Sequence, residues 1–349
     1  MLDVRSHLLK GHVIPAHPLA LDERLRLDER HQRALTRYYL AAGAGGVAVA
    51  VHTTQFQIRE PRHGLLRPVL ELASCTVDEE LARAPRDVVK IAGVCGRTVQ
   101  AVQEARLARE LGYHVALLSL GAWRDADERE VLEHCRVIGE IIPLMGFYLQ
   151  PAVGGRPLSY AFWRELAELP ALAAVKIAPF DRYRTLDVVR AVAEAGRRDV
   201  ALYTGNDDNI VVDLLTRFPH LGAPGAPAPR IVGGLLGHWA VWTRCAVGLL
   251  EEITVARDEP TLDPRWLTRA AAITDANGAL FDVAHAFAGS IAGIHEVLFR
   301  QGLLRGTWCL DPNDVLSPGQ REAIDRVMRA YPEMRDDAFV AEHLDEWLR

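Results

Sequence analysis

The sequence has very few lysines. Only Lys10, Lys90 and Lys176 stand among 40 basic residues, and the other 37 are arginines. A preference for arginine is most simply explained by coding bias, so the count alone excludes no function. It does make each lysine informative, because a guanidinium stays charged and cannot replace an amine that must lose its proton.

An excess of positive charge is also missing. The 349 residues carry 46 acidic against 40 basic side chains, which gives a formal net charge of −6. A chain with this balance has no global positive field to attract phosphate groups. We therefore expect no nucleic-acid partner.

Paired cysteines and long apolar runs are absent as well. The five cysteines are scattered and form no CxxC pair: Cys75, Cys95, Cys135, Cys245 and Cys309. This pattern argues against a zinc ribbon or a disulfide framework and indicates free thiols in a reducing cytoplasm. No stretch approaches ~20 uninterrupted apolar residues, and the first residues lack the layout of a secretory signal. We expect a cytoplasmic protein that does not enter a membrane.

A glycine-rich GxGxxG turn is missing after the first apolar run, which argues against an open sheet with a dinucleotide site. What the sequence does contain is eight short apolar runs that alternate with amphipathic segments. The runs span residues 12–18, 46–52, 88–94, 114–120, 143–149, 172–179, 200–205 and 230–237. Continuous apolar runs are typical of strands buried on both faces of a parallel sheet. Helices are predicted between them, over 28–42, 98–111, 127–142 and 159–169.

Eight strand–helix units over about 250 residues predict an α/β fold of the (β/α)₈ TIM-barrel type. Beyond residue 256 the pattern becomes helical, over 263–300, 318–330 and 336–349. We therefore expect two parts: a barrel formed by residues 1–256, and a C-terminal helical extension, residues 257–349, packed on it.

Lys176 lies in the sixth of these runs, Leu-Ala-Ala-Val-Lys-Ile-Ala-Pro. A buried ammonium needs a carboxylate partner or loses its proton, and a desolvated lysine becomes a nucleophile near neutral pH. Two interpretations stay open at this point: a lysine that forms a Schiff base with a carbonyl substrate, and a buried ion pair or a lysine that snorkels to the strand end. Lys90 also lies in an apolar run, so burial alone does not separate the two.

Polar side chains at the ends of other runs favour the catalytic interpretation. Tyr148 lies near the carboxyl end of the fifth run, and Thr53 and Thr54 follow the second. Active sites of barrels form at the carboxyl ends of the strands. A tyrosine hydroxyl there can relay protons while an imine forms, and a polar turn can hold a carboxylate.

With these residues the chain resembles the dihydrodipicolinate synthase / N-acetylneuraminate lyase family of class I aldolases. The family's strand-two GTTGE-type loop is similar to His52-Thr53-Thr54-Gln55-Phe56, and its strand-seven turn to Thr204-Gly205-Asn206-Asp207. Its strand-five tyrosine corresponds to Tyr148 and its Schiff-base lysine to Lys176.

The resemblance implies an imine with pyruvate or another 2-oxo acid, no cofactor, an aldehyde as a possible second substrate, and a homodimer or homotetramer. The expected catalytic residues are Lys176, Tyr148 and Thr53, and the expected substrate-binding residues are Thr54, His52, Gln55, Gly205 and Val232.

The sequence departs from that family's pattern at several positions. In the strand-two loop, His52 and Gln55 stand where the family has glycines, and Phe56 stands where the family has an acidic residue. The second tyrosine after strand four is missing from Ser119-Leu120-Gly121-Ala122-Trp123, and so is the arginine after strand five. True dihydrodipicolinate synthase activity is therefore not expected. An acid or base role for His52 stays open.

Three functions remain from the sequence alone. The first is a Schiff-base lyase or aldolase. The second is a barrel that binds a keto acid but has lost turnover, and the third, which we favour least, is a metal-dependent barrel enzyme. A metal site would need several His, Asp or Glu side chains at strand ends, and no such cluster stands out in the sequence.

Overall fold

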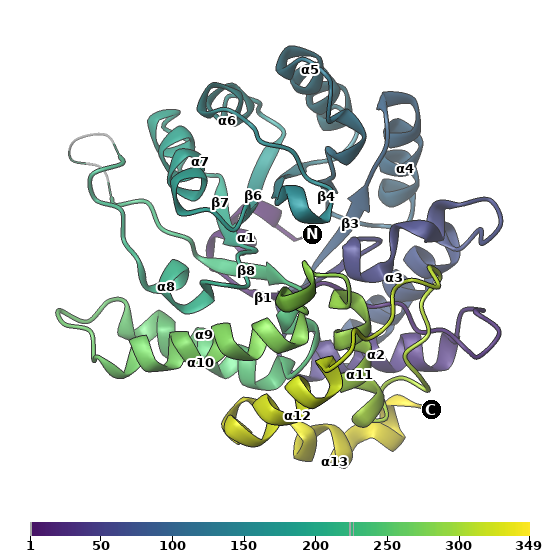
Figure 1. The fold of residues 1–349 in the computed structure, drawn as a ribbon. Coiled ribbons are helices and arrows are strands. Elements are labelled where there is room, and N and C mark those ends of the chain that lie inside the picture. The colour runs from purple at the N-terminus through teal and green to yellow at the C-terminus, as the bar shows by residue number, and fades with distance from the viewer. Residues whose placement is uncertain (1, 223–224, 226) are drawn as a thin grey trace.

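The computed structural model describes residues 2–222, 225 and 227–349, and its centre is an eight-stranded parallel barrel (Figure 1). The strands are β1 (Val13–Pro15), β2 (Gly46–Val49), β3 (Val89–Val94), β4 (Val115–Leu118), β5 (Leu144–Leu149), β6 (Leu172–Ala178), β7 (Ala201–Thr204) and β8 (Gly233–Leu236). Their order is β1-β8-β7-β6-β5-β4-β3-β2, and a parallel bridge between Ala16 and Ala48 joins the two ends. All eight predicted strands and the TIM-barrel fold are confirmed.

Helices surround the barrel in the expected alternation. They are α2 (Glu29–Ala41), α3 (Leu66–Arg83), α4 (Thr98–Glu110), α5 (Glu128–Gly139), α6 (Tyr160–Ala167), α7 (Arg182–Glu194), α8 (Ile210–Leu215) and α9 (Thr243–Ala256), while α1 (Val4–Leu9) precedes β1. Ser159 caps α6, because its hydroxyl accepts a hydrogen bond from the Phe162 N–H at 3.1 Å. Side-chain caps of this kind satisfy N–H groups that a helix start leaves without partners.

Short 3₁₀ turns follow several strands and helices. They span His52–Thr54, Phe56–Arg59, Gly121–Trp123, Pro151–Val153, His238–Ala240, Val283–His285 and Pro332–Met334.

Two buried layers result from the alternation of side chains along the strands. One row points into the barrel, where Met145 and Phe147 of β5 meet Ala174 and Ala178 of β6. The other row points outward and packs against the helices, as Val175 of β6 does. Successive side chains of a strand lie on opposite faces, so a shift of one residue decides which layer a side chain joins.

The C-terminal extension contains α10 (Arg265–Leu280), α11 (Ser290–Arg300), α12 (Gln320–Ala330) and α13 (Asp337–Trp347), which gather on one side of the barrel (Figure 1). The single helix predicted over 263–300 is therefore wrong. The chain turns at 281–289, where Asp282, Ala286 and Phe287 have left-handed backbone conformations with φ of 57°, 53° and 70°. The Asp282 carboxylate accepts a hydrogen bond from the Gly289 N–H at 3.0 Å, which stabilises this turn.

The helix α9 ends at Ala256, where we expected the barrel to end, and the division into two parts at that point stays a prediction. Over the described ranges, 2–222, 225 and 227–349, no helix combines the length and the apolar character needed to cross a bilayer.

Candidate active site

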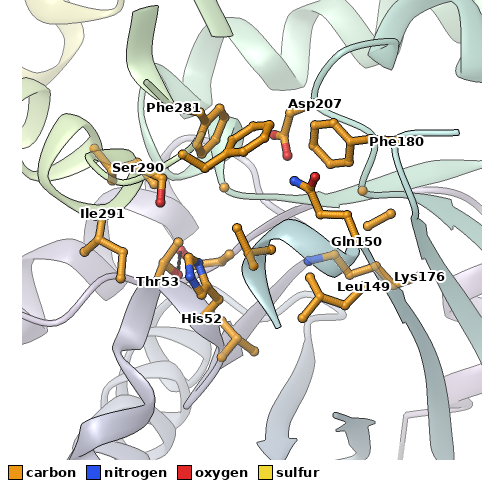
Figure 2. Close-up of a pocket in the computed structure, with 18 of the residues that line it drawn as sticks. His52, Thr53, Leu149, Gln150, Lys176, Phe180, Asp207, Phe281, Ser290 and Ile291 are labelled. Carbon is orange, nitrogen blue, oxygen red and sulfur yellow. Dashed lines mark hydrogen bonds between the residues drawn. The ribbon is translucent and has the colours of Figure 1, made fainter. Parts of the chain in front are cut away.

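A cavity opens where the carboxyl ends of the strands meet (Figure 2). The space between its walls is about 660 Å³ when the open mouth is included. The polar residues in its wall are His52, Thr53, Gln150, Lys176, Asp207 and Ser290. The rest of the wall is Ala16, Val51, Phe147, Leu149, Val153, Ala178, Phe180, Gly205, Gly237, Phe281, Phe287, Ile291 and Ile294.

Lys176 points into this cavity from β6 and is 9% exposed. Its Nζ lies 4.5 Å from the centre of the Phe147 ring. None of the ion pairs found among the described residues includes Lys176. Burial lowers the pKa of its ammonium, because the charged form loses its hydration in an apolar wall. The amine is thus open to the cavity and poised to be neutral at a lower pH than an ordinary lysine.

Asp207 is the acidic group whose charge acts on the pKa of Lys176. It follows β7, and its Oδ1 accepts a hydrogen bond from the His238 N–H at 3.2 Å. Burial raises the pKa of its carboxyl, while the charge of Lys176 opposes that rise. Each group therefore stabilises the ionised form of the other, and the two titrate as a pair. The Asn277 side chain of α10 donates to the Asp207 backbone carbonyl at 2.6 Å and fixes this turn.

Gly205 gives Lys176 its place in the cavity. A Cβ at this position would lie 2.6 Å from Cε of Lys176 and 2.8 Å from Cβ of Ala178. Non-bonded carbon atoms do not approach so closely. Gly205 therefore lines the cavity and leaves room for the lysine side chain, while its role in substrate binding stays a prediction.

The hydroxyl groups of the two threonines in the strand-two turn donate hydrogen bonds to the backbone. The Thr53 hydroxyl donates to the Ala16 carbonyl oxygen at 2.8 Å, and the Thr54 hydroxyl donates to the His17 carbonyl oxygen at 2.6 Å. Thr53 lines the cavity, whereas Thr54 is fully buried outside its wall. A hydroxyl whose proton is already donated has only lone pairs to offer, so neither is free to donate to a carboxylate.

The interpretation of Tyr148 as a proton relay is corrected by its position. Its side chain points outward from β5, with its ring centre 5.1 Å from that of Trp163 of α6. Its hydroxyl donates to the Leu158 carbonyl oxygen and accepts from the Leu158 N–H, both at 3.2 Å. The inward residue is the preceding one, Phe147, which pairs in register with Lys176. A phenyl ring therefore occupies the wall beside the lysine and carries no hydroxyl.

Gln55 and Val232 also lie away from the cavity. The Gln55 side-chain oxygen accepts a hydrogen bond from the Leu310 N–H at 2.6 Å, so this fully buried amide ties the strand-two turn to the C-terminal extension. Val232 precedes β8, and its N–H donates to the Leu202 carbonyl oxygen at 2.8 Å. The predicted strand 230–237 begins too early, which put Val232 at the wrong end of the barrel.

His52 faces the cavity, as expected, and its ring meets that of Phe56 edge-on at 5.9 Å. Burial, and then the neighbouring charge of Lys176, lower the pKa of His52 to about 4. The imidazole is therefore neutral near pH 7 and can accept a proton or a hydrogen bond.

Sequence reasoning missed two groups of cavity residues. Asp207 belongs to the strand-seven turn that resembles the family, but it was not predicted as a site residue. Its position shortly after a strand could have indicated that it lies at the barrel mouth. Phe281, Phe287 and Ile291 come from the C-terminal extension, and no pattern in the sequence connects them to Lys176. Within the part of the chain that the structure describes, no three His, Cys, Asp or Glu side chains are grouped so as to hold a metal ion.

The barrel has the fold of solved dihydrodipicolinate synthases. Similar solved structures include a dihydrodipicolinate synthase from Oceanobacillus iheyensis, with 18% identity over 95% of this chain and 99% of that one, and a TM-score of 0.74. A prophage protein of E. coli K12 that belongs to the dihydrodipicolinic acid synthase family, in complex with pyruvate, has 16% identity over 94% and 99%, and a TM-score of 0.72. The pyruvate complex of the chloride-inhibited dihydrodipicolinate synthase from Acinetobacter baumannii has 18% identity over 92% and 98%, and a TM-score of 0.73.

The chain therefore has the fold of this lyase family. No family model matches the sequence, and no curated protein matches it. A likeness of fold alone does not identify a reaction, so the function has to be argued from the site.

Proposed function

We propose that the protein is a class I lyase or aldolase whose Lys176 forms a Schiff base with a 2-oxo acid. The observation that carries this proposal is the amine of Lys176, which faces the cavity beside Asp207 and takes part in no ion pair among the described residues. The pyruvate complexes of two structures with the same fold agree with a 2-oxo acid. The imine serves as an electron sink for making or breaking the adjacent carbon bond.

The cavity offers groups for each proton transfer. The neutral amine attacks the carbonyl carbon, and the carbonyl oxygen takes up one proton to become the hydroxyl of a carbinolamine. The hydroxyl leaves as water when it receives a second proton, the one that the amine nitrogen has given up, and a protonated imine remains. Asp207, whose raised pKa keeps part of it protonated near neutral pH, is the proposed donor of the first proton. His52 is the proposed acceptor for the proton that the amine loses. Phe147, which lies beside the amine, contributes no proton because its phenyl ring has no ionisable group.

The carboxylate of the substrate needs donors other than the threonine hydroxyls. The backbone N–H groups of His52 and Thr53 stand at the start of the 3₁₀ turn, and no hydrogen bond within the described part of the chain uses them. Backbone donors of this kind suit an anionic oxygen. We propose that Thr53 acts through its backbone.

Borohydride trapping tests the proposal. Reduction in the presence of 2-oxo acids should convert the imine to a secondary amine, and peptide mass spectrometry should find the adduct on Lys176. Lys90 is an internal control in the same chain, since it is equally buried in a strand but bonded to Asp78 at 2.8 Å. Lys176→Met should abolish labelling. Absence of an adduct on Lys176 with every carbonyl compound tried would refute the proposal.

A second candidate is a barrel that forms the imine but no longer turns over. The phenyl ring of Phe147 in the wall beside Lys176 favours it, because a hydroxyl at that place is missing. Trapped adduct without any carbon–carbon bond change over long incubation would identify this case. A homodimer or homotetramer stays a prediction, which sedimentation measurements can check.

A further inference from the structure

The wall that faces Lys176 across the cavity is apolar. Figure 2 shows Phe281 and Phe180 on the side of the cavity opposite His52 and Lys176. Phe281, Phe287, Ile291 and Ile294 come from the end of α10, the 281–289 turn and α11, and together they cover the barrel mouth. The C-terminal extension is thus the part of the chain that shapes the outer half of the site.

Two of these aromatic side chains are held in place at a conformational cost. Phe180 and Phe287 both have left-handed backbones, with φ of 53° and 70°. Bulky residues rarely adopt this conformation, which costs of the order of 1–3 kcal/mol and concentrates at functional sites. Their rings meet edge-on with centres 5.8 Å apart, although they belong to loops more than 100 residues apart in sequence. The strained turns bring these two rings together over the cavity.

The cavity has no second cation. Its wall contains three titratable side chains among the described residues, namely Lys176, Asp207 and His52, and no arginine. Asp207 carries no positive charge in either protonation state, and His52 is neutral near pH 7. A substrate with a second carboxylate or a phosphate would bury that charge without a partner, which is unfavourable. A sugar-like chain would find only Gln150 and Ser290 as neutral polar partners in the outer half.

We infer that the carbonyl substrate carries an uncharged, apolar group, of the size of a phenyl ring or a branched alkyl chain, which packs under Phe281, Phe287 and Ile291. This inference rests on the proposed function, because it takes Lys176 as the point of attachment. It adds the substrate class: 2-oxo acids with an apolar tail, rather than dicarboxylic or hydroxylated ones.

Non-reactive hydroxy acids separate the pocket's preference from the imine chemistry. They lack a carbonyl and cannot react with Lys176. Calorimetry on the intact protein should find that phenyllactate binds about tenfold or more tightly than lactate, because the phenyl ring buries additional apolar area. The charged analogue 2-hydroxyglutarate should bind no better than lactate. Equal binding of the three acids, preference for 2-hydroxyglutarate, or binding of none would overturn the inference.

Variants locate the preference. Phe281→Ala should reduce the phenyllactate advantage about tenfold. Phe299→Ala is the matched control, because Phe299 lies on α11 but is 44% exposed and outside the cavity wall. Ile291→Lys adds the missing cation and should raise affinity for 2-hydroxyglutarate. If Phe281→Ala and Phe299→Ala change phenyllactate binding equally, the outer wall is not the binding surface.

Labelling with the matching carbonyl compounds then distinguishes the two claims. Phenylpyruvate should label Lys176 at a lower concentration than pyruvate or 2-oxoglutarate. Selective phenyllactate binding without any label on Lys176 would refute the Schiff-base function and leave the apolar pocket standing. Labelling by all three compounds at equal concentrations would refute the apolar preference and leave the Schiff base standing.

Discussion

Two strand lysines of this chain have opposite surroundings. Lys90 of β3 points outward, where its Nζ donates to the Asp78 carboxylate at 2.8 Å and to the Ser74 hydroxyl at 2.9 Å. Lys176 of β6 points inward and faces the cavity. Lys90 therefore differs from Lys176 in having bonded partners. Its partners lie 12 and 16 residues earlier, on α3, and they make it a structural ion pair.

Gly205 controls the position of Lys176, and a single methyl group tests this. Gly205→Ala should lower the rate of borohydride-dependent labelling about tenfold or more, because the new Cβ would lie 2.6 Å from Cε of Lys176 and move the amine. Gly248→Ala is the control, since nothing lies within 4 Å of a Cβ there. Gly205→Ala should also unfold at a lower urea concentration than Gly248→Ala, because the new Cβ would lie 2.8 Å from Cβ of Ala178, so labelling is compared where both variants are folded. Unchanged labelling in Gly205→Ala would show that the lysine adapts.

Burial lowers the pKa of Lys176, and the charge of Asp207 opposes this shift. Labelling should rise with pH as the amine becomes neutral, with a midpoint below that of an ordinary lysine, because burial lowers its pKa. Asp207→Asn removes a negative charge that favours the ammonium, so the pKa of Lys176 should fall further. We expect the midpoint to move down by about one pH unit or more.

The pH profile of labelling checks this shift, and Asp208→Asn serves as a control because Asp208 is exposed and outside the cavity wall. A midpoint that moves up in Asp207→Asn, or that moves equally in both variants, would contradict the pairing of Asp207 with Lys176.

At the level of single elements, β5 shows how one residue of register changes an assignment. The segment Phe147-Tyr148-Leu149 is apolar throughout, so nothing in its pattern says which side chains enter the barrel. The pairing of Phe147 with Lys176 decides it, and Tyr148 joins the outer layer with Trp163. The presence and type of the strand were predictable, whereas its inward face was not.

The turn between α10 and α11 depends on one buried amide. The Gln320 side chain donates to the Gly289 carbonyl oxygen at 3.0 Å and to the Leu280 carbonyl oxygen at 3.2 Å, and it is 2% exposed. Gln320→Ala removes the donor to the Leu280 carbonyl oxygen and leaves the Gly289 carbonyl oxygen with only the Gly293 N–H, at 2.8 Å. We expect a loss of about 1–3 kcal/mol in the free energy of unfolding and faster hydrogen exchange at residues 281–289.

Urea unfolding and exchange mass spectrometry measure these two effects. Gln103→Ala on α4 is the control, because Gln103 is exposed. Exchange that is unchanged at 281–289 but faster elsewhere would show that Gln320 does not support this turn.

At the scale of the whole molecule, a buried carboxylate joins the extension to the barrel. Asp336 precedes α13, and its Oδ2 accepts hydrogen bonds from the Tyr38 hydroxyl at 2.7 Å and the Arg244 N–H at 3.0 Å. Its Oδ1 accepts one from the Gln301 side chain at 2.9 Å. One residue thus connects α2, α9, the end of α11 and the start of α13. The extension is held by polar contacts as well as by apolar packing.

Buried histidines predict that the whole protein is less stable in mild acid. Burial lowers the pKa of His17, His238 and His295 to about 4. In the unfolded chain a histidine binds a proton below about pH 6.5, so the unfolded state takes up more protons and stability falls as pH falls. Each such histidine lowers the free energy of unfolding by about 2 kcal/mol between pH 7 and pH 5.

Urea midpoints at pH 7 and pH 5 measure this loss. His17→Gln should reduce the difference between the two midpoints, because His17 is fully buried between Thr36 and the Pro18 carbonyl group. His220→Gln, at an exposed position, is the control. Equal midpoints at the two pH values would contradict the prediction.

The sequence by itself determined the eight strands, most helix positions and the lysine that defines the site. Strands and helices follow from the spacing of apolar residues along the chain, and Lys176 stands out because it is one of only three lysines and lies in an apolar run. Only the tertiary structure decided which side chains surround that lysine. Phe147 replaces Tyr148 because strand pairing sets the inward face, and Asp207 acts on Lys176 because β6 and β7 lie side by side. Phe281 and Phe287 enter the cavity because a strained turn folds the extension over the barrel mouth. Such contacts join residues far apart in the chain, and no local pattern records them.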